Sequence, residues 1–251
     1  MSLNRLKLNK GKTEFIIFGQ SKQLDKMLYD SIQVGEDTIS GVQSVRNLGV
    51  YLDQELKMNE HVMRIVRTSY MNIRFIRSIR KCLSTNATKT IVQALVISRL
   101  DYCNSLLYGV SEVLIAKLQK IQNAAARLVL GLKKYDHITD ALYSLHWLPV
   151  RFRIQYKIAL ITFKVLTLNE PAYLVDLLKR KELTRTLRSE SKNLLEIPRS
   201  RLKSGGDRSF SVSAPTIWNR LPEHIKNVNT TEQFKAKLKT HYFSLAYCKA
   251  P

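Results

Sequence analysis

Acidic, histidine and cysteine side chains are the residues of this sequence that could bind a catalytic metal. Phosphoryl transfer by two metal ions requires carboxylates that converge on ions about 3.5–4 Å apart, but the sequence contains no Asp-Asp pair. Asp53 and Asp101 stand alone, and we expect each to cap or solvate the start of a helix. The five histidines and three cysteines are scattered singly, whereas a structural zinc site needs four nitrogen or sulfur ligands at suitable spacing. We therefore expect no catalytic residue and no metal site.

Basic side chains offer a different chemistry, the binding of phosphates. The segment 57–100 contains nine Lys or Arg residues and one acid, Glu60. Five basic residues recur at helical spacing beside an apolar face: Arg64, Arg67, Arg74, Arg77 and Lys81. Charges of both signs normally mix on a solvated helix face, so the near absence of acids favours contact with nucleic acid. This basic stripe is the candidate binding site, and an ordinary solvated face is the alternative.

The charge of the whole chain supports an anionic partner. The 251 residues include 41 Lys and Arg against 20 Asp and Glu, a formal net charge of +21. Self-repulsion on this scale destabilises a compact state, and the phosphates of nucleic acid would supply the counter-charge. Three isolated cysteines indicate a reduced, intracellular protein, cytoplasmic or nuclear. The most apolar stretch, 158–168, is too short to cross a bilayer, so we expect a soluble protein with no membrane partner.

The elements that position these residues begin with β structure at 13–52. The apolar run 15–18, which ends at Gly19, predicts a buried strand. Residues 31–40 predict a hairpin in which Gly35 adopts a positive φ. Residues 45–52 predict one further strand.

From about residue 57 the apolar period becomes helical. The first predicted helix has one apolar face: Val62, Ile65, Val66, Ser69, Ile73 and Ile76. A second helix is predicted from Asn86, as its N-cap, to Leu106. A third begins near Ser111 and ends at Gly131. Its apolar face consists of Leu114, Leu118, Ile121, Ala125 and Leu128.

Two prolines start the next helices, Pro149 a long one and Pro171 a short one. The apolar face of the long helix consists of Ile154, Ile158, Ile161, Val165 and Leu168. Residues 179–208 carry ten Lys or Arg, four acids and a Gly-Gly pair, and predict a mobile basic connector. The last helix starts at Thr230 with a capping box to Gln233. Its apolar face consists of Phe234, Leu238, Tyr242 and Leu245. Trp147 and Trp218 are predicted to lie in the core, and stacking on nucleic-acid bases is the alternative.

Several short blocks resemble the reverse transcriptases of LINE-type retrotransposons. Residues 8–19 (LNKGKTEFIIFG) resemble the block where the palm resumes after the catalytic aspartates, and 47–53 (NLGVYLD) resemble the primer-grip strand pair. The blocks similar to the thumb of the jockey-like branch are 98–104 (SRLDYCN), 118–127 (LQKIQNAAAR) and 145–149 (LHWLP). The blocks similar to its C-terminal tail are 208–210 (RSF), 214–215 (AP) and 218–222 (WNRLP). They occur in the family's order and extend over nearly the whole chain.

The resemblance implies roles for four N-terminal residues. Lys12 would lie near the nucleotide site, where a lysine can protonate the leaving pyrophosphate or neutralise its charge; the alternative is a solvated lysine. Leu48, Gly49 and Tyr51 would form the primer grip, where close approach of the primer favours Gly49; the alternative is a packing contact. The chain would begin after the catalytic motifs, so an upstream part would bind Mg²⁺ and this chain alone would have no polymerase activity.

The sequence thus predicts an α+β fold, with short N-terminal β-strands followed by a mainly α-helical, thumb-like bundle. The expected domains are a palm remnant at 1–56, a helical thumb-like domain at 57–178, and a basic connector with C-terminal helices at 179–251. By resemblance, the chain is a catalytically incomplete fragment of an RNA-directed DNA polymerase. It would hold an RNA or RNA/DNA template-primer, with no cofactor and no small-molecule substrate. The alternatives are a stand-alone basic RNA- or DNA-binding module and a protein-interaction domain that uses the Leu114–Leu128 face.

Overall fold

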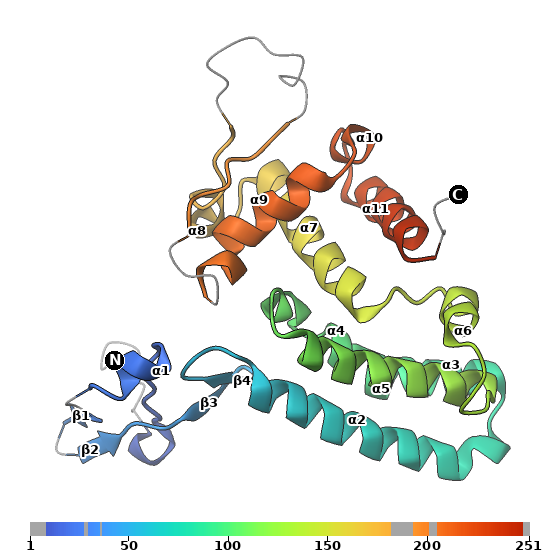
Figure 1. The fold of residues 1–251 in the computed structure, drawn as a ribbon, viewed down its shortest axis with the longest axis horizontal. Helices are drawn as coiled ribbons and strands as arrows, with labels where there is room; N and C mark the ends of the chain where they lie inside the picture. The colour runs from blue at the N-terminus through green and yellow to red at the C-terminus, as the bar shows by residue number, and fades with distance from the viewer. Residues whose placement is uncertain (1–8, 28–29, 36, 182–192, 201–204, 248–251) are drawn as a thin grey trace. The chain divides into compact units, whose positions relative to one another are not determined.

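The computed structural model describes residues 9–27, 30–35, 37–181, 193–200 and 205–247. The chain has the predicted α+β fold, with small antiparallel sheets near the N-terminus followed by a helical region (Figure 1). Its internal contacts divide it into two units, Met1–Arg64 and Ile65–Pro251.

The first unit contains a hairpin where one was predicted. β1 (Ser31–Val34) and β2 (Asp37–Ser40) pair antiparallel. Gly35, in the connection, has a φ of 67°, a left-handed value that glycine adopts without steric cost. This part of the prediction is confirmed.

A second hairpin replaces the single strand predicted at 45–52. Its strands are β3 (Ser44–Asn47) and β4 (Val50–Asp53), which pair antiparallel. Between them Leu48 has a φ of 46° and Gly49 a φ of 85°. Two consecutive positive φ angles match the right-handed twist of paired strands and reverse the chain within two residues. The prediction of one strand was wrong because it overlooked this turn.

The buried strand predicted at 15–18 does not form. Phe15 makes one isolated bridge to Gly41, and Phe18 is 49% exposed. A strand needs partners for its backbone N–H and C=O groups along its whole length. Among the described residues, the bridge from Phe15 to Gly41 is the one strand-like pairing of this segment. The neighbouring elements are the short helices η2 (Lys10–Lys12) and α1 (Ser21–Leu24).

Helix α2 (Asn59–Ile79) begins in the first unit and continues into the second. Asp53 Oδ1 accepts a hydrogen bond from the Lys57 N–H at 2.7 Å, so Asp53 fixes the turn that precedes the helix. Most of the predicted apolar face is buried, with 8% exposure or less at Val62, Ile65, Ser69, Ile73 and Ile76. Val66 is half-buried.

The second predicted helix is divided into shorter segments. These are α3 (Thr85–Val92), the π-helical turn η4 (Gln93–Ile97), α4 (Ser98–Asp101) and the 3₁₀ turn η5 (Asn104–Leu107). The N-cap is Ser84 rather than Asn86, because Ser84 Oγ accepts a hydrogen bond from the Ala87 N–H at 3.2 Å. The α-helix stops before Leu106 because Cys103 adopts a left-handed φ of 49°.

Helices α5 (Glu112–Leu130) and α7 (Val150–Leu168) are long helices of the second unit, and α6 (Ile138–Ser144) lies between them in sequence. The predicted start of α5 after Ser111 and its end at Gly131, with a φ of 69°, are confirmed. Its predicted apolar face is buried throughout: Leu114, Leu118, Ile121, Ala125 and Leu128.

Helix α7 starts after Pro149, as predicted. Ile154, Ile158 and Val165 are buried, and Ile161 is half-buried. Leu168 is 62% exposed, contrary to the prediction, because it is the last residue of α7 and Asn169 then turns the chain with a φ of 53°.

Three C-terminal helices pack on α7: α8 (Ala172–Val175), α9 (Phe210–Arg220) and α11 (Thr231–Tyr247) (Figure 1). The short helix α10 (Glu223–Lys226) contacts α11. The ring of Phe234 lies 4.1 Å from that of Phe163 and 6.1 Å from that of Trp218. Trp147 and Trp218 are 3% and 4% exposed, so the core positions predicted for both tryptophans are confirmed.

The N-terminal cap of α11 was predicted correctly, because the Gln233 N–H donates to Thr230 Oγ1 at 3.3 Å. The predicted apolar face is buried at Phe234, Leu238 and Tyr242, whereas Leu245 is 56% exposed. Leu245 therefore lies outside the helix-packing surface.

Part of the predicted basic connector is held by the helical core. Residues 182–192 and 201–204 lie outside the described residues. At 193–200, Leu195 is 2% exposed and exchanges two 2.8 Å hydrogen bonds with the Asn219 side chain. The Trp218 Nε1–H also donates to the Asn193 carbonyl at 2.9 Å. These contacts fix the segment against α9, which its composition did not indicate.

Candidate nucleic-acid interface

The basic stripe lies on the solvent side of α2 and the following 3₁₀ turn, η3 (Arg80–Cys82). Arg67, Arg74, Arg77 and Lys81 are all exposed, as a phosphate-binding surface requires. Helical repetition places an exposed tyrosine, Tyr70, among them. Stacking of bases on aromatic rings beside a cationic groove is a common mode of nucleic-acid binding.

Arg64 differs from the other stripe residues. Its guanidinium donates two hydrogen bonds to Glu60 Oε1, at 2.8 and 3.0 Å. It also lies 4.1 Å above the ring of Tyr51. Because the carboxylate and the ring already partner this cation, Arg64 contributes less free charge to phosphate binding than the other four residues do.

A basic groove between α2 and α5 extends the stripe within the second unit. It has a volume of about 680 Å³. Its cationic lining comprises Arg77, Arg80, Lys120, Arg127 and Lys134. No carboxylate lines this groove among the residues that the structure describes. We call this feature the α2–α5 groove.

Two of its arginines are held by main-chain carbonyls, Arg80 by the last turn of α5 and Arg127 by the segment that follows α5. Arg80 donates to the carbonyls of Leu128 and Val129, each at 3.1 Å. Arg127 donates to the carbonyls of Lys133 and Asp136, each at 3.2 Å. Cations are stabilised at the C-terminal end of a helix by the macrodipole and by its unpaired carbonyls. Both guanidinium groups are therefore positioned before any ligand binds.

The other three cations of the groove are less constrained. In the described part of the chain, the side chains of Arg77, Lys120 and Lys134 form no ion pair with a carboxylate. Lys134 lies 5.7 Å from the ring of Tyr135, which is 88% exposed. The groove thus combines fixed guanidinium groups, cations without a carboxylate partner among the described residues, and the exposed ring of Tyr70.

Sequence reasoning missed the contribution of α5 to this surface. The pattern of α2 identified Arg77, but nothing in it indicated which helix lies alongside. Lys120 and Arg127 belong to the block 118–127, which was singled out by resemblance alone. Their role becomes visible only when α5 is placed beside α2.

The residues assigned to a primer grip lie together at the second hairpin of the first unit. Leu48 is 84% exposed at the turn, and Gly49 follows it. The guanidinium groups of Arg46 and Arg64 lie 5.8 and 4.1 Å from the ring centre of Tyr51, on β4. Lys12 lies in a different element, η2, and is exposed.

His61 joins this hairpin to the start of α2. It is 4% exposed, and its Nδ1 accepts a hydrogen bond from the Tyr51 N–H at 3.4 Å. Burial lowers the pKa of His61 below its ordinary value of 6.5. The unfolded chain therefore binds a proton more readily than the folded chain, and protonation of Nδ1 removes the acceptor for Tyr51.

We expect the first unit to lose stability as the pH falls below about 6.5, the ordinary pKa of histidine. The stabilisation from neutral His61 is fully present above that pH and is lost as the pH falls through the lower pKa of the folded state. Amide-exchange protection factors of β3 and β4 at pH 7 and pH 5 measure this loss. His61→Gln should reduce the difference, whereas replacement of the exposed His137 by Gln should preserve it. An equal difference in both variants would contradict the role of His61.

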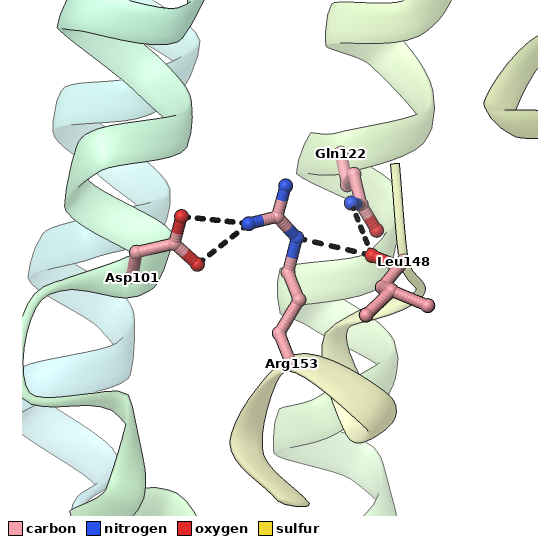
Figure 2. A network of polar contacts seen from close by, with 4 residues as sticks. All are labelled: Asp101, Gln122, Leu148 and Arg153. Carbon is pink, nitrogen blue, oxygen red and sulfur yellow. Dashed lines mark hydrogen bonds and ion pairs between the residues drawn. The ribbon is translucent and has the colours of Figure 1, made fainter. Parts of the chain in front are cut away.

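Three of the family-like blocks meet at one polar cluster in the second unit (Figure 2). Arg153 Nη1 donates to both carboxylate oxygens of Asp101, at 2.7 and 2.6 Å. Arg153 Nε donates to the Leu148 carbonyl at 3.0 Å, and Gln122 Nε2 donates to the same carbonyl at 2.8 Å. Asp101 is the last residue of α4 and forms an ion pair with Arg153. The prediction that Asp101 caps or solvates the start of a helix was therefore wrong.

A second glutamine of the block 118–127 completes this cluster. Gln119 Oε1 accepts the Val150 N–H at 2.9 Å, at the first residue of α7. The cluster fixes the segment 145–149 between α4, α5 and α7. Its polar groups satisfy one another, so we assign them a structural role.

Among the described residues, no three His, Cys, Asp or Glu side chains gather into a group that could hold a metal ion. Within the same residues, none of the helices combines the length and apolar character needed to cross a membrane. Comparison of the chain with protein-family models, curated proteins and solved structures finds no match.

Proposed function

We propose that this chain binds the sugar–phosphate backbone of nucleic acid along the basic stripe of α2 and in the α2–α5 groove. The observation that carries the proposal is the groove, whose described lining has five cations and no carboxylate. Arg80 and Arg127 are already fixed by main-chain carbonyls, so they lose little side-chain entropy on binding. Contacts of this kind position a nucleic acid without reading its bases.

We also propose, from the resemblance, that the nucleic acid is the RNA/DNA template-primer of a retrotransposon reverse transcriptase. In this proposal the chain supplies the holding surface of the thumb, and another part of the polymerase supplies the catalytic aspartates and Mg²⁺. The exposed turn at Leu48 and Gly49 supports a primer contact, because its backbone is accessible. Lys12 is exposed as well, as its proposed role near the nucleotide requires.

The surface proposed for the protein-interaction alternative is buried. It relied on the apolar face of α5, and Leu114, Leu118 and Ile121 on that face are at most 3% exposed. These side chains are part of the core, so they are not available to a partner helix. A stand-alone nucleic-acid-binding module would use the same basic groove as a polymerase thumb.

Binding of duplex DNA should depend steeply on salt. Each neutralised phosphate releases counterions, which gives a slope of log K against log[salt] of about −0.9 per contact on B-form DNA. With four stripe and groove cations in contact, we expect a slope of about −3.6. Replacing Arg77 and Lys120 with Gln should flatten this slope by about 1.8 and leave sequence preference unchanged. Fluorescence anisotropy of labelled duplexes over a salt series measures both quantities.

The matched control removes the same charge elsewhere. Lys164 and Lys179 are exposed and lie outside the stripe and the groove, so their replacement by Gln should leave the slope unchanged. Equal slopes for the two double variants would mean that net charge alone drives binding and would refute the groove. To test the template-primer proposal, an RNA/DNA hybrid with a recessed 3′ end should compete at least as well as duplex DNA.

A further inference from the structure

A second hollow of the second unit has features that phosphate-backbone binding does not use. It has a volume of about 600 Å³ and shares no described lining residue with the α2–α5 groove. Side chains of α3, η4, α7 and α11 line it, together with the segment 145–148. A volume of this order is typical of sites for small molecules. The sequence analysis expected no small-molecule ligand.

Three lysines from three helices converge on this hollow. They are Lys89 of α3, Lys157 of α7 and Lys239 of α11. One carboxylate, Asp101, is also in the described lining, but it already forms a two-oxygen contact with Arg153. None of the three ammonium groups forms an ion pair with a carboxylate of the described residues. Like charges that share a hollow repel one another, and an anion would relieve that repulsion.

The remainder of the hollow is partly apolar. Ile97, Leu145 and the ring of Tyr156 contribute to it. The π-helical turn η4 contributes Gln93 and Ile97 to the lining, and single π-helical turns occur frequently at functional sites. Asn104 also lines the hollow, and its buried Oδ1 has no hydrogen-bond donor within the described part of the chain.

We infer that this hollow binds a nucleotide. The phosphate lies among Lys89, Lys157 and Lys239, and the base lies against the apolar wall beside Tyr156. A ligand with an anionic group joined to a flat ring would contact both the lysines and the apolar wall. Inorganic phosphate would contact the lysines alone, and an uncharged ring would contact the apolar wall alone. The nucleotide is either free or the 5′-phosphorylated end of a strand. This inference does not rest on the proposed function, because the groove supplies none of its residues.

The test measures the binding of deoxyadenosine monophosphate to the full chain by calorimetry and by tryptophan fluorescence. Trp147 lines the hollow and Trp218 does not, so binding should change the emission. Lys157→Gln combined with Lys239→Gln should weaken binding about tenfold or more, a loss of about 1.4 kcal/mol or more. Inorganic phosphate and deoxyadenosine, as separate probes, should each bind more weakly than the nucleotide.

Two controls separate this site from the groove. Lys164→Gln with Lys179→Gln, which removes equal charge from the exposed surface, should leave nucleotide affinity unchanged. Arg77→Gln with Lys120→Gln should also leave it unchanged while flattening the salt dependence of duplex binding. The nucleotide site is refuted if the Lys157/Lys239 variant keeps full affinity, if no saturable binding occurs, or if inorganic phosphate binds as tightly as the nucleotide.

A short 5′-phosphorylated oligonucleotide distinguishes the two sources of the ligand. If it displaces deoxyadenosine monophosphate in the parent chain but not in the Lys157/Lys239 variant, the hollow receives the end of a strand. If the mononucleotide binds and the oligonucleotide does not displace it, the hollow receives a free nucleotide. Either result supports the nucleotide site.

Discussion

Replacing Phe234 with alanine should lower the free energy of unfolding of the second unit by about 3–5 kcal/mol. Phe234 is fully buried on α11, and its ring stacks on that of Phe163 at 4.1 Å with an interplanar angle of 12°. The substitution removes this aromatic contact and the contact with Trp218, and it leaves a cavity where α7, α9 and α11 meet. Denaturant unfolding followed by tryptophan fluorescence measures the effect, because Trp147 and Trp218 both belong to the second unit.

The control for this prediction lies on the same helix. Leu245 was also predicted to belong to the apolar face of α11, but it is 56% exposed. Leu245→Ala should change stability by no more than about 0.5 kcal/mol. If both substitutions had the same small effect, this would contradict the packing of α11 on α7 and its place in the helical core.

Replacing Arg153 with alanine should lower the free energy of unfolding by about 2–3 kcal/mol. The substitution removes both hydrogen bonds to Asp101 and the bond to the Leu148 carbonyl. The side chains of Arg153 and Asp101 are 16% and 38% exposed, so the loss should fall below the range for a fully buried ion pair. Equilibrium unfolding in urea gives the value.

The neighbouring residue provides a matched control. Arg151 pairs with Glu112 at the surface, where the two side chains are 57% and 73% exposed, so Arg151→Ala should cost less than about 1 kcal/mol. A double-mutant cycle with Asp101→Asn isolates the energy of the Arg153–Asp101 pair. Equal losses for the two arginine substitutions would contradict the structural role of the cluster.

Local chemistry in the sequence was sufficient to predict several boundaries. Gly35 and Gly131 adopt the left-handed conformations expected of them, and the side chain of Thr230 caps α11 as predicted. The apolar residues of α5, spaced alternately four and three positions apart, correctly identified its buried face. Such features depend on residues close in sequence, so they can be predicted from a single sequence.

Other features depended on partners distant in sequence. The apolar residues 15–18 lacked a strand along which to pair, and Phe18 remains exposed. Leu168 continues an apolar period but lies at the end of α7, beyond the packing surface. Helix α9 forms although it contains Pro215, which disfavours a helix interior. Its buried residues Ala214, Ile217 and Trp218 stabilise it through tertiary packing, which no local propensity reports.

The candidate site divides in the same way. The sequence of α2 determined that Arg67, Arg74, Arg77 and Lys81 lie together and face solvent, because helical periodicity fixes the positions of neighbouring turns. Only the tertiary structure brought Lys120 to Arg77 in the α2–α5 groove, joined Asp101 to Arg153, and gathered lysines from α3, α7 and α11 around one hollow. The physical reason is that contacts between helices depend on how their buried faces pack, whereas the pattern within each helix reports only which face is buried.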